Sequence, residues 1–309
     1  MKMKKIVVLT GAGVSAESGV NTFRDAGGLW EGYRVEDVAT PQGFENNPEL
    51  VLNFYNERRQ QLSTVKPNKA HLLIAELQKD YEVVVITQNV DDLHERAGSK
   101  HIIHLHGELL KMREVDNDMV TYPCNHDIKV GDLGVNGKQL RPHIVWFGED
   151  VPMIIRAVEE VETADIVLVI GTSLQVYPAA GLMHYAPEGT PIYYIDPHPS
   201  IGSSGNITVI AEKASVGVEK VIDLIKKNIK MSNFPKFLLA DNTDFPDDIF
   251  VVHLEFPRFV LNVDTNEVEW LEEFEEEDTK ELETESERLI EEALAFYERE
   301  IIRIERDEY

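Results

Sequence analysis

Residues 1–230 alternate between short, continuous apolar runs and stretches whose apolar residues recur with a helical period. The helical stretches span about 48–62, 68–79, 152–163, 176–186 and 215–229. The apolar runs are Ile6–Leu9, Val83–Ile86, Ile102–Leu105, Ile144–Phe147, Ile166–Ile170, Ile192–Ile195 and Ile207–Ile210. Continuous runs of this length are typical of parallel strands that are buried on both faces. Strands alternating with helices therefore predict an α/β fold with a doubly wound parallel sheet.

Two regions depart from this alternation. Residues 111–141 are polar, contain three glycines and have no clean period, which predicts a small inserted module. Beyond Lys230 we expect an extra C-terminal α+β extension, with strands at Phe250–Phe256, Arg258–Val263 and Val268–Phe274. A turn at 264–266 and an amphipathic helix at 279–306 complete the prediction for this part of the chain.

Charge supports a boundary near residue 230. The chain has a formal net charge of −26. Residues 231–309 hold 25 acidic and 7 basic side chains, a net −18, whereas residues 1–230 hold a net −8. We therefore predict a catalytic domain at 1–230 and an acidic C-terminal extension at 231–309. A surface this acidic repels nucleic acid phosphates, so no nucleic acid partner is expected.

The sequence predicts neither a membrane protein nor a disulfide-bonded one. No window approaches the roughly 18 consecutive apolar residues of a membrane span. Lysines precede Ile6–Leu9, but this run is shorter than the apolar core of a secretory signal, so we expect a buried strand there. Cys124 is the only cysteine, which excludes an internal disulfide and favours a reducing, cytoplasmic location.

A glycine-rich turn, Gly11-Ala12-Gly13-Val14-Ser15-Ala16, directly follows the first predicted strand. Such turns let backbone N–H groups approach a pyrophosphate in Rossmann-like domains. The usual GxGxxG pattern is incomplete because Ala16 takes the third position. By itself, the motif is also compatible with a tight strand-to-helix turn that binds no ligand.

Five strings decide between these alternatives. GAGVSAESGVNTFRDAGGLW is followed by TQNVDDLHERAG, HLHGELLK, VWFGE and GTSLQVYPAAG. In this order and at these spacings they closely resemble the sirtuin family over residues 4–228, and the bacterial, class III type in particular. The resemblance implies NAD-dependent removal of acyl groups from protein lysines. The expected products are nicotinamide and O-acyl-ADP-ribose.

The resemblance assigns roles residue by residue. His106 matches the catalytic base, and Asn89 and Asp91 match residues of the nicotinamide and ribose pocket that take part in catalysis. The expected NAD-binding residues are Gly11, Ala12, Gly13, Ser15, Phe23, Arg24, Gln88, Asn89, Asp91, Gly171, Thr172, Ser173 and Asp196. The expected substrate-binding residues are Ala39, Tyr55, Arg58, Val145, Trp146, Phe147 and Gly148.

The positions of these residues along the chain support the assignment independently. Gln88 and Asn89 follow one predicted strand, and His106 follows the next, so all three lie at carboxyl ends of strands. Ligands bind there in open α/β sheets. A histidine that titrates near neutrality suits a base that takes a proton from a ribose hydroxyl. His104, two residues earlier, is interpreted as a packed or supporting residue.

The acyl preference rests on Tyr55 and Arg58, which stand at i and i+3 of a predicted helix. This spacing resembles the YxxR signature of sirtuins that remove succinyl, malonyl or glutaryl groups, and an arginine can hold the distal carboxylate of such groups. Ala39 is small where other sirtuins carry a bulky residue, which leaves room for a longer acyl chain. The alternative is an ordinary surface ion pair between Arg58 and Glu57. Deacetylation is expected as well.

The chain departs from the family in its inserted module, where most sirtuins hold a structural zinc with four cysteines. Cys124 alone cannot form that site, so no zinc is expected. A remnant site with His126 is a weak alternative. We expect packing to hold the module together instead, through Val120, Tyr122, Ile128, Val130 and Leu133.

Three alternatives remain open from the sequence. The same fold could carry an NAD glycohydrolase or ADP-ribosyltransferase, although the residues that serve an acyl-lysine peptide argue against it. A non-catalytic NAD sensor is disfavoured because Asn89, Asp91 and His106 are all present. The C-terminal extension either packs on the rest of the chain as a solvated appendage or mediates self-association or partner binding.

Overall fold

The computed structural model describes residues 3–20, 29–30, 32–117, 119–232, 235–242, 245–271 and 279–307. The chain divides into two compact units, Met1–Ile222 and Asp223–Tyr309. Within the described ranges, no helix is both long enough and apolar enough to cross a lipid bilayer.

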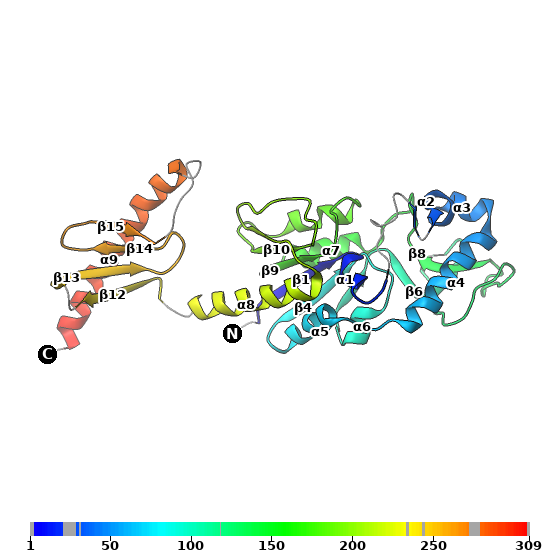
Figure 1. The fold of residues 1–309 in the computed structure, drawn as a ribbon, viewed down its shortest axis with the longest axis horizontal. Coiled ribbons are helices and arrows are strands. Elements are labelled where there is room, and N and C mark those ends of the chain that lie inside the picture. Colours follow the sequence, from blue (N-terminus) through cyan, green and yellow to red (C-terminus); the bar gives the residue numbers. More distant parts are fainter. Residues whose placement is uncertain are drawn as a thin grey trace. The chain divides into compact units, whose positions relative to one another are not determined.

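A six-stranded sheet forms the centre of the first unit (Figure 1). Its strands are β1 (Lys5–Thr10), β4 (Glu82–Thr87), β5 (Ile102–His104), β9 (Ile166–Ile170), β10 (Ile192–Ile195) and β11 (Ile207–Ile210). The spatial order is β11-β10-β9-β1-β4-β5, and all neighbours are parallel. The chain moves outward from β1 to β5 and then returns to β9 on the other side of β1. The predicted doubly wound, Rossmann-like fold class is thus confirmed, and the switch point of the strand order lies between β1 and β9.

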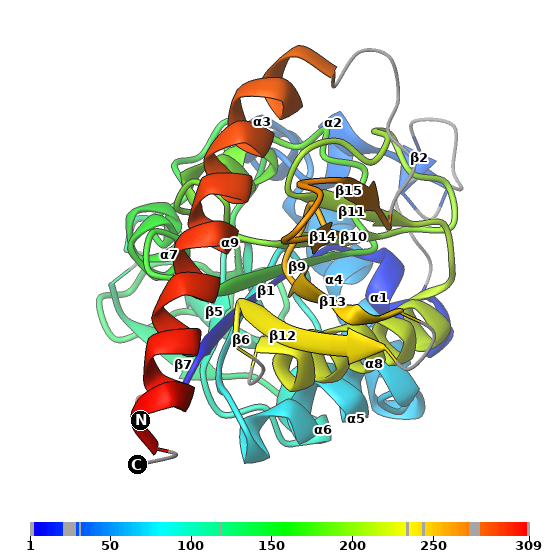
Figure 2. The same cartoon turned by 90° about the vertical axis from the view of Figure 1, so that its left-hand side faces the viewer.

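Helices cover both faces of this sheet (Figure 2). On one face lie α5 (Lys69–Glu76), α6 (Leu93–Ala97) and α8 (Ala214–Ser232), with the short 3₁₀ helix η2 (Leu77–Lys79) following α5. On the other lie α7 (Ile154–Val161) and the 3₁₀ helix η3 (Ala179–Tyr185), which replaces the expected helix at 176–186. Because both faces are buried, every residue of β9 is buried, which explains the continuous apolar runs.

A smaller module packs around its own apolar core. Its helices are α2 (Val35–Val38), α3 (Pro41–Asn46) and α4 (Pro48–Thr64). Its sheets are a β2–β3 hairpin (Leu29–Trp30, Tyr33–Arg34) and an antiparallel sheet of order β7-β6-β8. The strands of the latter are β6 (Gly107–Glu114), β7 (Thr121–Pro123) and β8 (Leu140–Ile144). Asn47 and Thr40 accept backbone N–H bonds at the starts of α4 and α3, and a proline follows each of them.

The predicted strand at Ile144–Phe147 is wrong. Ile144 ends the antiparallel strand β8, and the next three residues form a loop. Trp146 accounts for the apolar run, because its side chain is buried in the module against Phe44 and Tyr55. An apolar run alone does not distinguish a strand from a buried loop.

Polar side chains of α4 hold much of the inserted module. Asn56 Nδ2 donates to Ile128 O and Asn56 Oδ1 accepts from Ile128 N, at 2.9 Å each. Arg59 donates to the carbonyls of Leu109 and His126 at 3.0 and 3.2 Å. The expected apolar packing is right for Ile128 and Tyr122, but it is wrong for the exposed residues Val120, Val130 and Leu133.

The second unit contains a four-stranded antiparallel sheet and one long helix. The strands are β12 (Phe237–Asn242), β13 (Phe245–His253), β14 (Phe259–Asn262) and β15 (Val268–Trp270), in that spatial order, and the helix is α9 (Thr279–Asp307). Phe259 and Leu261 pack against Leu289 and Ala293 of α9. The expected strands and helix are therefore present, but β12 was not anticipated and β13 starts earlier and ends earlier than predicted. Residues 272–274 of the third predicted strand lie outside the described ranges.

Candidate active site

Three glycines bring the ends of β1 and β9 into backbone contact at the switch point. Gly11 N donates to Ile170 O at 3.0 Å, and Gly13 N donates to Gly171 O at 2.8 Å. A Cβ on Gly13 would lie 2.6 Å from Gly171 Cα, and Gly171 has a φ of +62°. No side chain fits at these positions. The glycine turn therefore lies against Gly171, beside the predicted NAD-binding residue Thr172.

The side chains of Ser15, Asn89 and Asp91 contact one another next to this turn. Ser15 lies in the short helix α1 (Gly13–Ala16), and the other two follow β4. The Ser15 hydroxyl accepts from Asn89 Nδ2 at 3.1 Å and donates to Asp91 Oδ2 at 2.9 Å. All three side chains are buried. Burial raises the pKa of Asp91, while hydrogen bonds from Leu93 N and Ser15 act in the opposite direction.

His106 lies just beyond β5, next to Gln88. Its Nδ1 is 3.1 Å from Gln88 O, and because a carbonyl only accepts, Nδ1 carries the proton. Burial lowers the pKa of His106, and the bond to Gln88 offsets part of that effect. The ring is therefore neutral near pH 7, with Nε2 as an acceptor. Among the described residues, Nε2 has no hydrogen-bond partner.

Gly107 shows why the residue after His106 is glycine. Its φ is +85°, and a Cβ there would lie 2.1 Å from His143 O of β8. The close approach of β8 also allows Val145 N to donate to His106 O at 2.9 Å. This bond connects the predicted substrate-binding loop, Val145 to Gly148, to the predicted base.

The remaining predicted NAD residues follow neighbouring strands. Gln88 Nε2 donates to Thr172 Oγ1 at 3.2 Å, across the end of β1. Ser173 O accepts from Ser200 Oγ at 3.1 Å. Asp196 directly follows β10, is buried and accepts from His198 N at 2.9 Å. Phe23 and Arg24 lie outside the described residues.

The predicted acyl-binding residues lie in the module and around the loop at 145–148. Tyr55 is 1% exposed, and its hydroxyl accepts from Trp146 Nε1 at 3.0 Å. Burial raises the pKa of Tyr55, so it stays protonated. Ala39 is also buried, and its carbonyl accepts from Phe147 N at 2.9 Å. Phe147 itself is exposed, and Gly148 has a φ of +93°.

Arg58 has contacts that relate to both readings of its role. Its guanidinium lies 3.6 Å from the Phe54 ring centroid and donates to Phe54 O at 2.6 Å. The same group is 3.4 Å from a carboxylate oxygen of the exposed Glu57. The ion pair between Arg58 and Glu57, which the alternative interpretation assumes, is therefore present. The same guanidinium also lies over the Phe54 ring in the module core.

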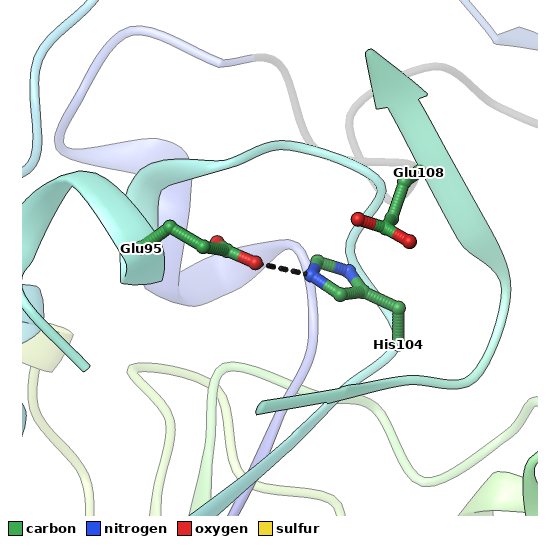
Figure 3. A group of neighbouring side chains, drawn as sticks. All are labelled: Glu95, His104 and Glu108. Atoms are coloured by element: carbon green, nitrogen blue, oxygen red, sulfur yellow. Dashed lines mark hydrogen bonds and ion pairs between the residues drawn. The ribbon is translucent and has the colours of Figure 1, made fainter. Parts of the chain in front are cut away.

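Sequence reasoning missed one group next to the site, and of a second group it named only His104. His71 and His94 are both buried and lie with ring centroids 4.8 Å apart, in contact with Ser15 and Thr10 respectively. Glu95, His104 and Glu108 lie together (Figure 3), and His104 Nδ1 is 3.1 Å from Asn89 O. All but His71 stand within the five strings, so a signal was available, but their pairing depends on contacts between separate elements.

Residues 11–178 match the model of the Sir2 family. The chain belongs to this family. A protein from Bacteroides thetaiotaomicron named NAD-dependent protein deacylase is 58% identical over 230 residues, which cover 72% of this chain and 98% of that protein. A protein of the same name from Helicobacter pylori is 53% identical, covering 75% and 98%. The resemblance to sirtuins is thus confirmed.

Solved structures of Sir2 homologues support the same family assignment. A crystal structure of a Sir2 homologue in complex with NAD has a TM-score of 0.65 at 40% identity, covering 74% of this chain and 91% of that one. A Sir2 homologue with ADP-ribose has a TM-score of 0.66 at 40% identity, covering 74% and 94%. Residues 238–306, in the second unit of this sirtuin, match a domain of unknown function, DUF8828.

Proposed function

We propose that this sirtuin is an NAD-dependent deacylase of protein lysines. The observation that carries the proposal is the neutral His106, whose Nδ1 bonds Gln88 O and whose Nε2 is an acceptor. It stands at the carboxyl edge of the sheet with Asn89, Asp91 and the glycine turn. The relatives named NAD-dependent protein deacylase are matched over nearly their full length, which supports the same activity here.

The residues at the switch point fit NAD. The backbone contact between Gly13 and Gly171 keeps side chains away from the place where a pyrophosphate would approach. Asn89 and Asp91 offer an amide and a carboxylate, which suit a carboxamide and ribose hydroxyls. Asp196 follows β10, where a carboxylate accepts from ribose hydroxyls and disfavours a 2′-phosphate. When bound, NAD supplies a glycosidic bond to nicotinamide and an ADP-ribosyl acceptor for the acyl group.

His106 acts as the general base. Its neutral Nε2 accepts a proton from a ribose hydroxyl, and the Nδ1 bond to Gln88 O keeps the ring in the required tautomer. The substrate peptide is proposed to lie along the loop 145–148, whose Val145 N is bonded to His106 O. The module thereby orients the acyl-lysine relative to the base, which is the protein's main contribution to the rate.

We propose that Tyr55, Arg58 and Ala39 set the acyl preference, with removal of succinyl and malonyl groups in addition to acetyl groups. Arg58 offers a guanidinium that a distal carboxylate can pair with. Ala39 is small and close to Phe147 of the peptide loop. Glu57 competes for the same guanidinium, but it is exposed and its contact is long.

Two further points extend the proposal. We propose a cytoplasmic location, where a single thiol would stay reduced. The acidic second unit is proposed to mediate self-association or partner binding. Light scattering of the full chain across a range of concentrations tests self-association, and a constant monomer mass would contradict it.

The deciding experiment uses the full chain, NAD and one peptide carrying acetyl-lysine or succinyl-lysine, with mass analysis of all products. We expect free lysine, nicotinamide and O-acyl-ADP-ribose in equal amounts. Nicotinamide and ADP-ribose with an unchanged peptide would instead indicate an NAD glycohydrolase. A peptide heavier by ADP-ribose would indicate a transferase. The variant Glu219→Gln removes one exposed charge outside the site and serves as a matched control.

A further inference from the structure

The loop after β4 is held by two imidazoles. Beyond the last ladder position, Thr87 with His104, the carbonyls of Gln88 and Asn89 point toward β5 and its extension. His106 Nδ1 lies 3.1 Å from Gln88 O, and His104 Nδ1 lies 3.1 Å from Asn89 O. Each imidazole therefore bonds one of two successive carbonyls, and the Asn89 bond involves a residue of the proposed NAD pocket.

The second nitrogen distinguishes the two histidines. His104 Nε2 is 2.7 Å from Glu95 Oε1, as Figure 3 shows. Both partners, the Glu95 carboxylate and the Asn89 carbonyl, can only accept hydrogen bonds. Both nitrogens of His104 must then carry protons, which makes the ring an imidazolium. Within the described part of the chain, His106 bonds only the Gln88 carbonyl, and its ring is neutral.

The surroundings of His104 balance its charge. Glu95 comes from α6, and Glu108 comes from β6 on the other side of the ring (Figure 3). Lys111 pairs with Glu108 at 2.6 Å. Two carboxylates thus face two cations, and this balance leaves little reason for a metal ion at the cluster. Asp91 and His94 are the other titratable groups whose charges interact with His104.

We propose that His104, held as an imidazolium by Glu95, is a positioning residue that fixes the Asn89 carbonyl and so orients the Asn89–Asp91 pocket. The proposal rests on the deacylase function and deepens it. Asn89 N is bonded to Thr87 Oγ1 and Asn89 Nδ2 to Ser15 Oγ, so the carbonyl bond is the third restraint on this residue. A neutral His104 would carry one ring proton, so it could keep only one of its two bonds, to Asn89 O or to Glu95.

A pH dependence follows. Burial alone lowers the pKa of His104, but the bond and charge of Glu95, together with Glu108, outweigh burial and raise it. Activity should fall at high pH as His104 loses its proton, and at low pH as His106 gains one. The kcat/KM profile for NAD is therefore expected to be bell-shaped, with an acidic limb set by His106 and an alkaline limb to which His104 contributes.

The test compares pH profiles of kcat/KM for NAD in the wild type, Glu95→Gln and His104→Asn. Glu95→Gln keeps an acceptor but removes the charge, so the alkaline limb should move to lower pH while the acidic limb stays. His104→Asn keeps a donor for the Asn89 carbonyl without a titrating ring. It should retain activity within about tenfold of the wild type and lose the His104 contribution to the alkaline limb. Glu219→Gln should reproduce the wild-type profile.

Several results would overturn the proposal. One is an alkaline limb that stays in place in Glu95→Gln, and another is a uniform loss of activity with an unchanged profile, as a purely structural role would give. A profile that changes on addition of a chelator would identify a cation site instead. NMR titration of the His104 ring nitrogens gives a readout independent of turnover. Two protonated nitrogens at pH 7.5 are expected, and a neutral ring contradicts the inference even if the chain proved not to be a deacylase.

Discussion

The hydroxyl of Ser15 donates a 2.9 Å hydrogen bond to Oδ2 of Asp91, joining the glycine turn after β1 to the loop after β4. The same hydroxyl accepts a hydrogen bond from Asn89 Nδ2, so the Ser15 side chain bonds both Asn89 and Asp91. All three are buried, and removing the hydroxyl would leave two polar atoms without partners at an interior position.

Ser15→Ala should therefore lower kcat/KM for NAD by roughly 10-fold to 100-fold, the equivalent of about 1.4–2.8 kcal/mol. Ser63→Ala is the matched control, because Ser63 is exposed on α4 and bonds only a carbonyl of its own helix. Steady-state kinetics with varied NAD is the measurement. Equal values for the two variants would show that Ser15 does not organise the pocket.

His106→Ala should reduce deacylation by about 10²–10⁴-fold and leave NAD binding nearly intact, since a general base contributes to the chemical step. In the wild type, turnover should fall with decreasing pH below about 6.5, because the pKa of His106 is lowered and the neutral ring is the active form. Turnover and calorimetric NAD binding are measured on the same preparation. A variant that kept more than about a tenth of wild-type turnover would contradict the assignment.

Arg58→Met should weaken desuccinylation by roughly 2–4 kcal/mol in transition-state binding, because a buried distal carboxylate would lose its cation. Deacetylation should change much less. The measurement is kcat/KM on one peptide carrying either acyl group. Equal losses would mean that Arg58 supports the module through Phe54 rather than the acyl group.

Tyr55→Phe should show the same selectivity as Arg58→Met with a smaller loss, and the structure adds a second consequence. The Tyr55 hydroxyl is the acceptor for the buried Trp146 Nε1. Its removal should also lower the free energy of unfolding by about 1–3 kcal/mol, so kinetics with this variant need a stability measurement beside them.

Purified protein should contain well under one zinc per chain, and a chelator should not lower its Tm. The physical reason is that Cys124 is the only thiol, and it is buried with its S–H directed at His126 O. Elemental analysis together with thermal melts gives the measurement. One equivalent of zinc would contradict this prediction and would direct the search for ligands to clusters such as Glu95, His104 and Glu108.

Stability should fall as the pH drops below about 6.5. Burial lowers the pKa of His71 to about 4 and that of His94 well below its usual value, so both rings are neutral in the folded state. The unfolded chain takes up these protons near pH 6.5, and the folded chain does not. Their contribution is complete above pH 6.5 and decreases by about 1.4 kcal/mol per pH unit for each histidine as the pH falls toward 4.

Urea unfolding at pH 7.5, 6.0 and 5.0 measures this dependence. His71→Gln should reduce the slope by the contribution of one histidine, whereas His184→Gln, at an exposed position, should leave it unchanged. An unchanged slope in His71→Gln would show that the acid sensitivity has another origin, such as the ion pairs of Glu149 with Arg141 and Arg113.

The sequence by itself determined the α/β class, the strands of the central sheet and the order of the polar residues at their carboxyl ends. Strand period and apolar runs are local properties, and a parallel sheet places every strand's carboxyl end at one edge. Gln88, Asn89 and His106 could therefore be placed together from spacing alone. The same local reasoning failed at Ile144–Phe147. The apolar Trp146 there belongs to a loop that is buried against another element, not to a strand.

Only the tertiary structure decided how the residues of the site are charged and supported. His104 and His106 differ by two positions, yet one meets a carboxylate from α6 and the other only a carbonyl. His71 and His94 belong to different helices and are neutral because their packing excludes water. Protonation depends on burial and on the partner of each nitrogen, and both are set by contacts between segments far apart in the chain.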